Sequence, residues 1–269
     1  MSIKFGIIGG GVMGEALLSR LLSRELYRPQ EVLVSDPNAD RLQTLEKQYG
    51  VGVTSDNHAA AGATEVLLLA IKPQLFDRVT ADLPTPGTAQ QVPVVISILA
   101  GVPLSKLSAA FPEVPTIRVM PNTPAIVGAG MSAIAAGPGV EPHHLERAKQ
   151  VLQAVGETIE VPESLMDAVT GVSGSGPGYV AILIEALTDG GVCAGLPRAI
   201  AAQLALQTVL GTATLMRENS LHPAELKDRV TSPGGTTIAG IAALEKAGFR
   251  SAIIEAVQAS AARSKELGK

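Results

Sequence analysis

The chain has 269 residues, of which 46% are hydrophobic and 17% are charged, and its formal net charge at pH 7 is −4. This composition is typical of a folded globular protein and leaves room for one large or two ordinary domains. Lys and Arg residues are scattered rather than clustered, which argues against a nucleic-acid binder and leaves small molecules as the expected partners.

Cysteine and histidine usage points away from disulfide and metal chemistry. A single cysteine, Cys193, excludes an internal disulfide, and four His without ligand spacing argue against zinc, so no metal is expected. Cys193 lies in an apolar run rich in Ala and Gly and is predicted to be a small buried residue. The N-terminal MSIKFGIIGGGVMG is interrupted by glycines and lacks a cleavage-site pattern, so we expect no signal peptide, no membrane span and a cytoplasmic location.

The first 162 residues alternate short β-branched runs with helical stretches. Strands that are apolar on both faces are predicted over residues 4–10, 31–36, 65–71, 93–99 and 116–122. Helices are predicted over residues 14–24, 39–50 and 102–111, and residues 132–136 and 143–156 continue the pattern. This order predicts a doubly wound α/β domain with a parallel sheet.

From residue 163 to 269 the sequence changes to long stretches rich in Ala, Leu and Ile that are predicted to be entirely helical. They cover residues 179–195, 197–218, 223–230 and 237–267. Several are apolar on more than one face, and a helix of that kind must be buried. So short a segment cannot cover every such face by itself, so we expect a partner chain, with a homodimer as the leading case.

A dinucleotide-binding turn is predicted near the N-terminus. Gly9, Gly11 and Gly14 form G-x-G-x-x-G between an apolar strand and a helix. The first glycine allows the tight turn, the second lets the backbone approach a pyrophosphate, and the third lets the helix pack close to the strand. The amides at the helix start, which include those of Val12 and Met13, then face the anion.

The end of the second predicted strand carries a mixed signal for the cofactor. Asp36 lies 22 positions after Gly14, where a carboxylate binds the ribose hydroxyl of NAD. Ser35, Asn38 and Arg41 cluster around the same point, and Arg41 is able to pair with the 2′-phosphate of NADP. The residues leave NADP and NAD open, and they leave open a second interpretation of Asp36 as a helix N-cap.

Two further strand ends are expected to face the same crevice, because ligands of such folds bind at the carboxyl ends of the strands. Ala70, Lys72 and Pro73 follow the strand over residues 65–71, and Ser97 ends the next strand. A solvated lysine is the alternative interpretation of Lys72.

Three motifs together resemble the pyrroline-5-carboxylate reductase family. Asn122 lies between prolines in Val-Met-Pro-Asn-Thr-Pro at 119–124, Gly-Ser-Gly-Pro occupies 174–177, and the most specific motif, residues 228–240, contains the segment TSPGGTTIAG. The resemblance runs over essentially the whole chain. It implies an N-terminal Rossmann domain and an all-α C-terminal dimerisation domain whose helices interlace in a homodimer or a higher oligomer.

The resemblance also implies the reaction and its residues. An NAD(P)H-dependent enzyme, which in this family usually prefers NADPH, would reduce the imine of 1-pyrroline-5-carboxylate to L-proline. The amides and hydroxyls of Gly235 and Thr236, with Ser232 and Gly234 in the same loop, would bind the substrate carboxylate. Thr237 would hydrogen-bond the ring nitrogen, and Asn122 with residues 70–73 would line the nicotinamide side. From the residues themselves, an uncharged loop with free amides and hydroxyls at a helix start suits a small anion.

No dedicated general acid is expected, because the imine nitrogen can arrive protonated from water. The four His residues are interpreted as structural, and His222 as a helix-start residue.

Two rival functions predict different features. A β-hydroxyacid dehydrogenase would need a lysine and an asparagine in the long helix over residues 179–195, which contains neither. A dinucleotide-sensing dimer would need no substrate loop, so replacement of Thr237 would leave its behaviour intact.

Overall fold

The computed structural model describes residues 2–84 and 92–268, so residues 1, 85–91 and 269 of the two predicted domains lie outside the description. Two compact units are present: residues 1–174 together with 259–269, and residues 175–258. The boundary at residue 162 placed by the sequence pattern stays a prediction.

The first unit contains an eight-stranded sheet with the order β3-β2-β1-β4-β5-β6-β7-β8. All neighbouring pairs are parallel except β6 and β7, which are antiparallel. The chain reverses its direction of winding between β1 and β4, which is where ligands bind in doubly wound sheets. The strands are β1 (Phe5–Ile8), β2 (Val32–Ser35), β3 (Gly52–Thr54), β4 (Val66–Leu69), β5 (Val94–Ser97), β6 (Thr116–Met120), β7 (Gly130–Ala136) and β8 (Gly156–Glu160).

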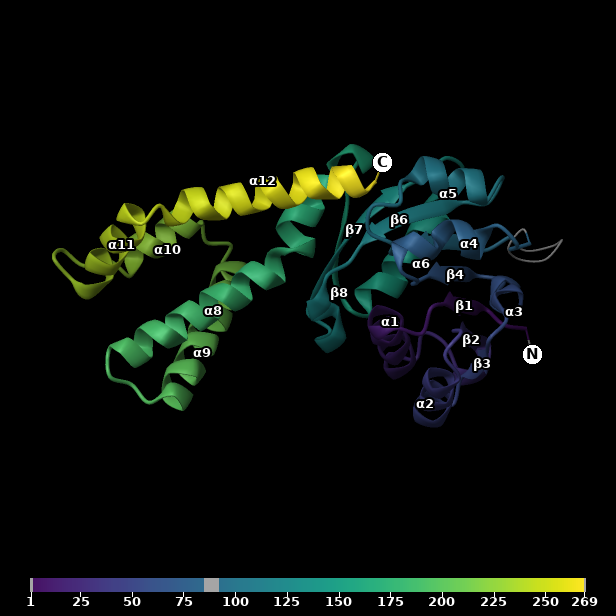
Figure 1. The fold of residues 1–269 in the computed structure, drawn as a ribbon, viewed down its shortest axis with the longest axis horizontal. Coiled ribbons are helices and arrows are strands. Elements are labelled where there is room, and N and C mark those ends of the chain that lie inside the picture. The colour runs from purple at the N-terminus through teal and green to yellow at the C-terminus, as the bar shows by residue number, and fades with distance from the viewer. Residues whose placement is uncertain (1, 85–91, 269) are drawn as a thin grey trace. The chain divides into compact units, whose positions relative to one another are not determined.

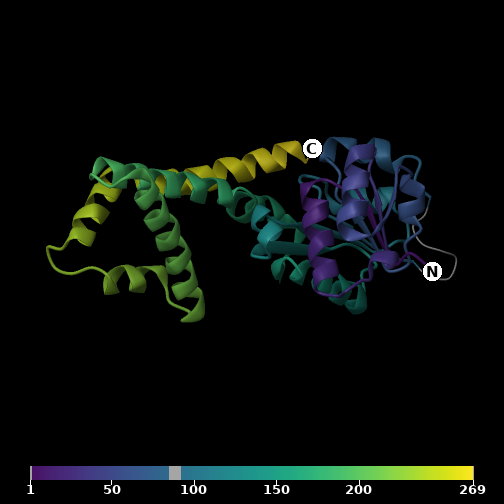
Figure 2. The same ribbon diagram turned by 90° about the horizontal axis from the view of Figure 1, so that it is seen from below.

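Helices cover both faces of this sheet, as Figures 1 and 2 show from two sides. Alternate strand residues point into two separate cores, as Ile7 and Ile8 do from β1. One core includes side chains of α1 (Val12–Ser23), α2 (Ala39–Tyr49) and α6 (Pro142–Gln153). The other includes side chains of α3 (Asn57–Ala61), α4 (Phe76–Thr80), α5 (Leu104–Ala110) and α7 (Met166–Val169). Both faces of the strands β1, β2, β4, β5 and β6 are therefore buried almost throughout, as their uniformly apolar sequences predict.

The second unit is entirely helical. It contains α8 (Gly176–Cys193), α9 (Arg198–Glu218), α10 (Pro223–Arg229), α11 (Thr236–Lys246) and the first part of α12 (Phe249–Leu267). A π-helical turn over residues 170–174 precedes α8. The helix predicted over residues 237–267 is two helices, because Gly248 has a φ of 74° and ends α11.

The prediction that Cys193 is buried is wrong for the single chain, because its side chain is exposed. In residues 175–258, all of which the structure describes, only Thr188, Ala201 and Ala205 are buried. Large apolar side chains such as Ile182, at 66% exposure, stay uncovered. An apolar sequence run predicts a buried residue only where another element packs on it.

Candidate functional site

The glycine-rich turn between β1 and α1 has the backbone geometry that its sequence predicts. Gly9 has a φ of 108°, and a Cβ there would stand 2.6 Å from the carbonyl oxygen of Ala70. A Cβ at Gly14 would stand 2.3 Å from the carbonyl oxygen of Gly9, whereas a Cβ at Gly11 would meet nothing within 4 Å. Close packing thus requires glycine at positions 9 and 14, whereas Gly11 leaves open space above the turn.

Helix α1 begins directly at this open space. Gly11 is its N-cap and supplies no side chain to the first amides, which have no acceptors within the helix. The amides at this end, with the positive end of the helix dipole, are suited to bind a phosphate.

Asp36 is held against the turn from the end of β2. Its Oδ2 accepts a hydrogen bond from the Gly10 amide at 2.9 Å, and its Oδ1 accepts one from the Asn38 amide at 2.9 Å. The N-cap of α2 is Asn38, whose Oδ1 accepts a hydrogen bond from the Arg41 amide at 3.1 Å. The alternative interpretation of Asp36 as the N-cap is therefore wrong.

Arg41 also binds the turn rather than extending into solvent. Its Nε donates to the Gly10 carbonyl oxygen at 2.5 Å, and its Nη2 forms an ion pair with Glu15 of α1. Tyr49, at the end of α2, donates its hydroxyl to the same carboxylate at 2.9 Å. Burial raises the pKa of Glu15, but the hydrogen bonds from Arg41 and Tyr49 and the Arg41 charge outweigh burial, so the net pKa lies below the usual 4.5. Glu15 is therefore ionised at neutral pH.

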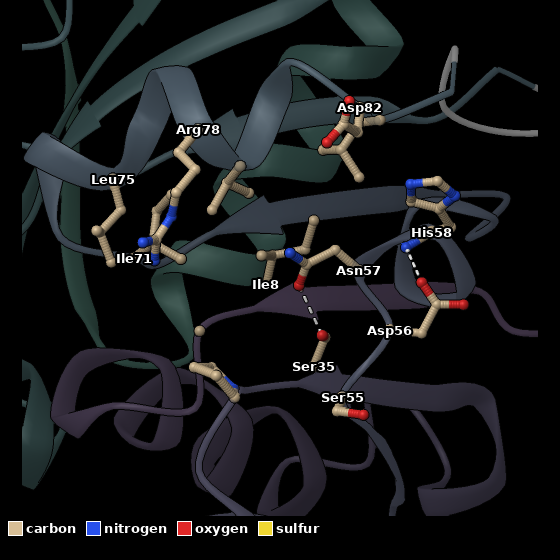
Figure 3. Close-up of a pocket in the computed structure, with 14 residues that line it drawn as sticks. Ile8, Ser35, Ser55, Asp56, Asn57, His58, Ile71, Leu75, Arg78 and Asp82 are labelled. Atoms are coloured by element: carbon tan, nitrogen blue, oxygen red, sulfur yellow. Dashed lines mark hydrogen bonds between the residues drawn. The ribbon is translucent and has the colours of Figure 1, made fainter.

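A cavity of about 330 Å³ lies beside the turn, on the side of β4 (Figure 3). Its apolar wall includes Ile8, Ile71 and Leu75, and polar side chains enter it from the ends of β2 and β3. The Ser35 hydroxyl donates to Asn57 Oδ1 at 2.7 Å across these ends. A flat apolar base with a polar sugar fits such a lining.

Sequence reasoning missed most polar residues of this cavity. They are Ser55, Asp56, Asn57, His58, Arg78 and Asp82. The strand that places the first four, β3, has three residues, and α3 has five, so neither gives a readable periodicity. Asp56 caps α3 by accepting the His58 amide at 2.9 Å, and an Asp before a short Ala run was the available signal.

The remaining residues predicted on the cofactor side occupy three strand ends. Lys72 is exposed and precedes a short 3-10 helix that starts at Pro73. Ser97 is buried, and its hydroxyl accepts from the Leu99 amide at 3.4 Å. Asn122 follows β6 and is partly buried.

The Asn122 side chain hydrogen-bonds two neighbouring segments of the protein. Its Oδ1 accepts the Met131 amide at 2.8 Å, and its Nδ2 lies 3.2 Å from the Ser173 carbonyl oxygen and 3.3 Å from the Ser173 hydroxyl. The Asn122 side chain therefore joins β6, β7 and the π-helical turn.

The predicted substrate loop forms the start of α11 in the helical unit. Gly235 is the N-cap and has no side chain to cap the first amides of the helix, which include those of Thr236 and Thr237. Gly234 has a φ of 66°, and a Cβ at Gly235 would stand 2.3 Å from the Ser232 hydroxyl oxygen. The loop therefore brings backbone amides and three hydroxyl side chains together at a helix start. His222 caps α10 by accepting the Ala224 amide at 3.2 Å, as its sequence position predicts.

Two features of the described residues bear on other functions. No group of three or more His, Cys, Asp or Glu side chains that could hold a metal ion gathers in them. Helix α9 is long and apolar enough to cross a membrane by length and composition, but an uncovered protein interface would leave its side chains exposed in the same way.

Comparisons with known proteins converge on one enzyme family. A family model described as pyrroline-5-carboxylate reductase dimerisation matches residues 163–267, and one described as NADP oxidoreductase coenzyme F420-dependent matches residues 4–101. The chain is 63% identical to the pyrroline-5-carboxylate reductase of Synechocystis sp. over 100% of both chains. It is 45% identical to that of Methanosarcina acetivorans over 99% of this chain and 98% of the relative.

A solved structure agrees with these sequences. Plasmodium falciparum pyrroline carboxylate reductase with NADP bound superposes with a TM-score of 0.87 and 30% identity, covering 99% of this chain and 98% of that one.

Proposed function

The chain belongs to the pyrroline-5-carboxylate reductase family, and we propose which of its residues bind the cofactor and the substrate in the reaction of this family. The protein is an NAD(P)H-dependent oxidoreductase that reduces 1-pyrroline-5-carboxylate to L-proline, the last step of proline biosynthesis. The observation that carries the proposal is the uncapped α1 start beside the open space at Gly11.

The N-terminal unit holds the dinucleotide. The amides at Gly11, Val12 and Met13 bind the pyrophosphate, while Gly9 and Gly14 keep the turn tight. The adenosine end enters the cavity of Figure 3, with its ribose toward the group formed by Ser35, Asp36, Asn38 and Arg41. The nicotinamide side is lined by Ala70, Lys72, Pro73, Ser97 and Asn122. When bound, the reduced nicotinamide supplies the hydride for the imine carbon.

The loop at the start of α11 holds the substrate. The carboxylate binds the amide of Thr236 and the hydroxyls of Ser232 and Thr236, with Gly234 and Gly235 shaping the backbone beside it, because the amides at a helix start stabilise an anion although they carry no formal charge. The Gly235 amide itself donates to the Ser232 carbonyl oxygen at 3.0 Å. Thr237, partly buried in the first turn, hydrogen-bonds the ring nitrogen and orients the imine. The proton on that nitrogen comes with the substrate from water, so the chain needs no general acid.

The helical unit belongs to an oligomer, since its family model is one of dimerisation. We propose a homodimer that forms through the C-terminal helices and is the unit from which any higher oligomer is built. The dimerisation family model, together with the exposed apolar side chains of α8, α9 and α11, supports a protein partner for these helices. We propose that the protein binds neither membrane nor nucleic acid and has a cytoplasmic location.

The test is an assay of nicotinamide oxidation with 1-pyrroline-5-carboxylate, comparing NADPH with NADH. We expect oxidation that depends on the substrate, and no oxidation with either cofactor would refute the proposal.

A Thr237→Val variant keeps the shape of the side chain but removes its hydroxyl. We expect kcat to fall at least tenfold. Thr214→Val, whose hydroxyl bonds only the Leu210 carbonyl of its own helix, is the matched control. An unchanged kcat in the Thr237 variant would contradict the proposed bond from this hydroxyl to the ring nitrogen.

A further inference from the structure

The charges around Gly10 disfavour the phosphate that distinguishes NADPH from NADH. Asp36 binds the Gly10 amide, Arg41 binds its carbonyl oxygen, and Glu15 pairs with Arg41. The two carboxylates and the one guanidinium of this group together carry a formal net charge of −1. A phosphate monoester adds about −1.5 to −2 at neutral pH, so it meets repulsion unless the Arg41 charge is released.

Arg41 is well placed for that phosphate but is held by other partners. It lies in the first turn of α2, just after β2, from where an arginine reaches the phosphorylated ribose in dinucleotide-binding folds. Its Nε and Nη2 are engaged by Gly10 and Glu15, and Tyr49 fixes Glu15 from the other end of α2. The side chains of Arg41 and Glu15 are each only 26% exposed, so solvent screens the pair incompletely.

We propose that Glu15 is a specificity-determining residue: by pairing with Arg41 it holds the guanidinium on Gly10, cancels its charge, and weakens the preference for a cofactor with a 2′-phosphate. This inference rests on the proposed cofactor site. If the Glu15–Arg41 ion pair only shaped the glycine-rich turn, its loss would change the affinity for NADP and the affinity for NAD equally.

The test measures binding, independently of turnover, with fragments that differ only in the phosphate. Adenosine 2′,5′-bisphosphate and adenosine 5′-monophosphate are titrated calorimetrically into the full-length wild type, Glu15→Gln, Arg41→Met and the double variant. We expect Glu15→Gln to raise the affinity ratio of bisphosphate to monophosphate about fivefold, the effect of one partly exposed ion pair. Arg41→Met should lower the ratio, and the double variant should behave like Arg41→Met.

Glu160→Gln is the matched control, because it also removes one negative charge but lies on β8, at an edge of the sheet. Its affinity ratio should equal that of the wild type. Equal changes for both fragments in Glu15→Gln, or an unchanged ratio, would overturn the inference.

Two further outcomes separate misfolding, and failure of the proposed function, from failure of the inference. If Glu15→Gln does not fold, an unchanged ratio in Arg41→Met overturns the inference by itself. The proposed function fails separately, when the wild type oxidises neither cofactor with the substrate.

Discussion

Asn122 shows how a residue predicted from a motif is used by the fold. Its side-chain oxygen accepts the Met131 amide and its nitrogen donates to Ser173, so the side chain ties three segments together. A direct contact with the nicotinamide stays a prediction. The hydrogen bonds themselves predict a role in stability.

Replacing Asn122 by Ala leaves the partly buried Met131 amide and the Ser173 carbonyl without these partners. We expect the free energy of unfolding to fall by about 1–3 kcal/mol, measured by urea denaturation. Asn219→Ala is the control, because that side chain donates only to the Leu215 carbonyl of its own exposed helix end, and it should change stability by less than about 0.5 kcal/mol. Equal losses in the two variants would contradict the role of Asn122.

The Glu15 ion pair gives a pH dependence of stability. Its folded-state pKa is lowered, so the pair stabilises the protein above the unfolded pKa, near 4.5, and this contribution is lost as pH falls through the folded value. At pH 7 the wild type should exceed Glu15→Gln in unfolding free energy by up to about 1 kcal/mol. The difference should shrink below about pH 4.5. Urea denaturation of both proteins across this pH range measures the difference in unfolding free energy. A difference that stays constant with pH would contradict the contribution of the ion pair.

At the level of elements, the parallel core strands could be predicted because each is uniformly apolar between glycine-rich or polar turns. β3, α3 and α4 were missed because they have three, five and five residues, too few to show a period. β8 was missed because it is an edge strand with polar residues, GETIE. The cofactor turn was therefore predictable from its glycines, whereas the cavity beside it, built by β3 and α3, was not.

The glycines of the cofactor turn separate a folding role from a binding role. Gly14→Ala places a Cβ against the Gly9 carbonyl oxygen and should destabilise the β1-to-α1 packing, with a clear loss of melting temperature. Gly11→Ala meets no atom within 4 Å, so it should keep the wild-type melting temperature.

Cofactor affinity is the second measurement on the same pair. Gly11→Ala should lose at least tenfold in affinity for NADP, by calorimetry, because the methyl group enters the space where a pyrophosphate approaches the backbone. A Gly11→Ala protein with full affinity would show that the phosphate binds elsewhere.

On the scale of the whole molecule, the two units differ in how far one chain can bury its own apolar surface. The sheet of the first unit is covered on both faces, whereas residues 175–258 bury three side chains. The Tyr179 hydroxyl of α8 donates to the Ala256 carbonyl oxygen of α12 at 3.2 Å, so these two helices contact each other although the unit buries few side chains. The sequence pattern predicts that the helical unit needs a partner chain, but it does not predict which side chains contact that partner.

A charge on the uncovered surface of α9 should therefore separate the chains. Leu210 is 58% exposed in the single chain, and Leu210→Glu would bury an unpaired carboxylate in the proposed interface, which costs far more than a lost contact. Light scattering after gel filtration should show the wild type at a multiple of 27.6 kDa and the variant at or near 27.6 kDa. Leu26→Glu, the same change at a 41% exposed residue of the first unit, should keep the wild-type mass. If neither variant dissociates, Leu210 lies outside the interface and α9 is covered in another way. If both dissociate, the loss of mass is not specific to α9.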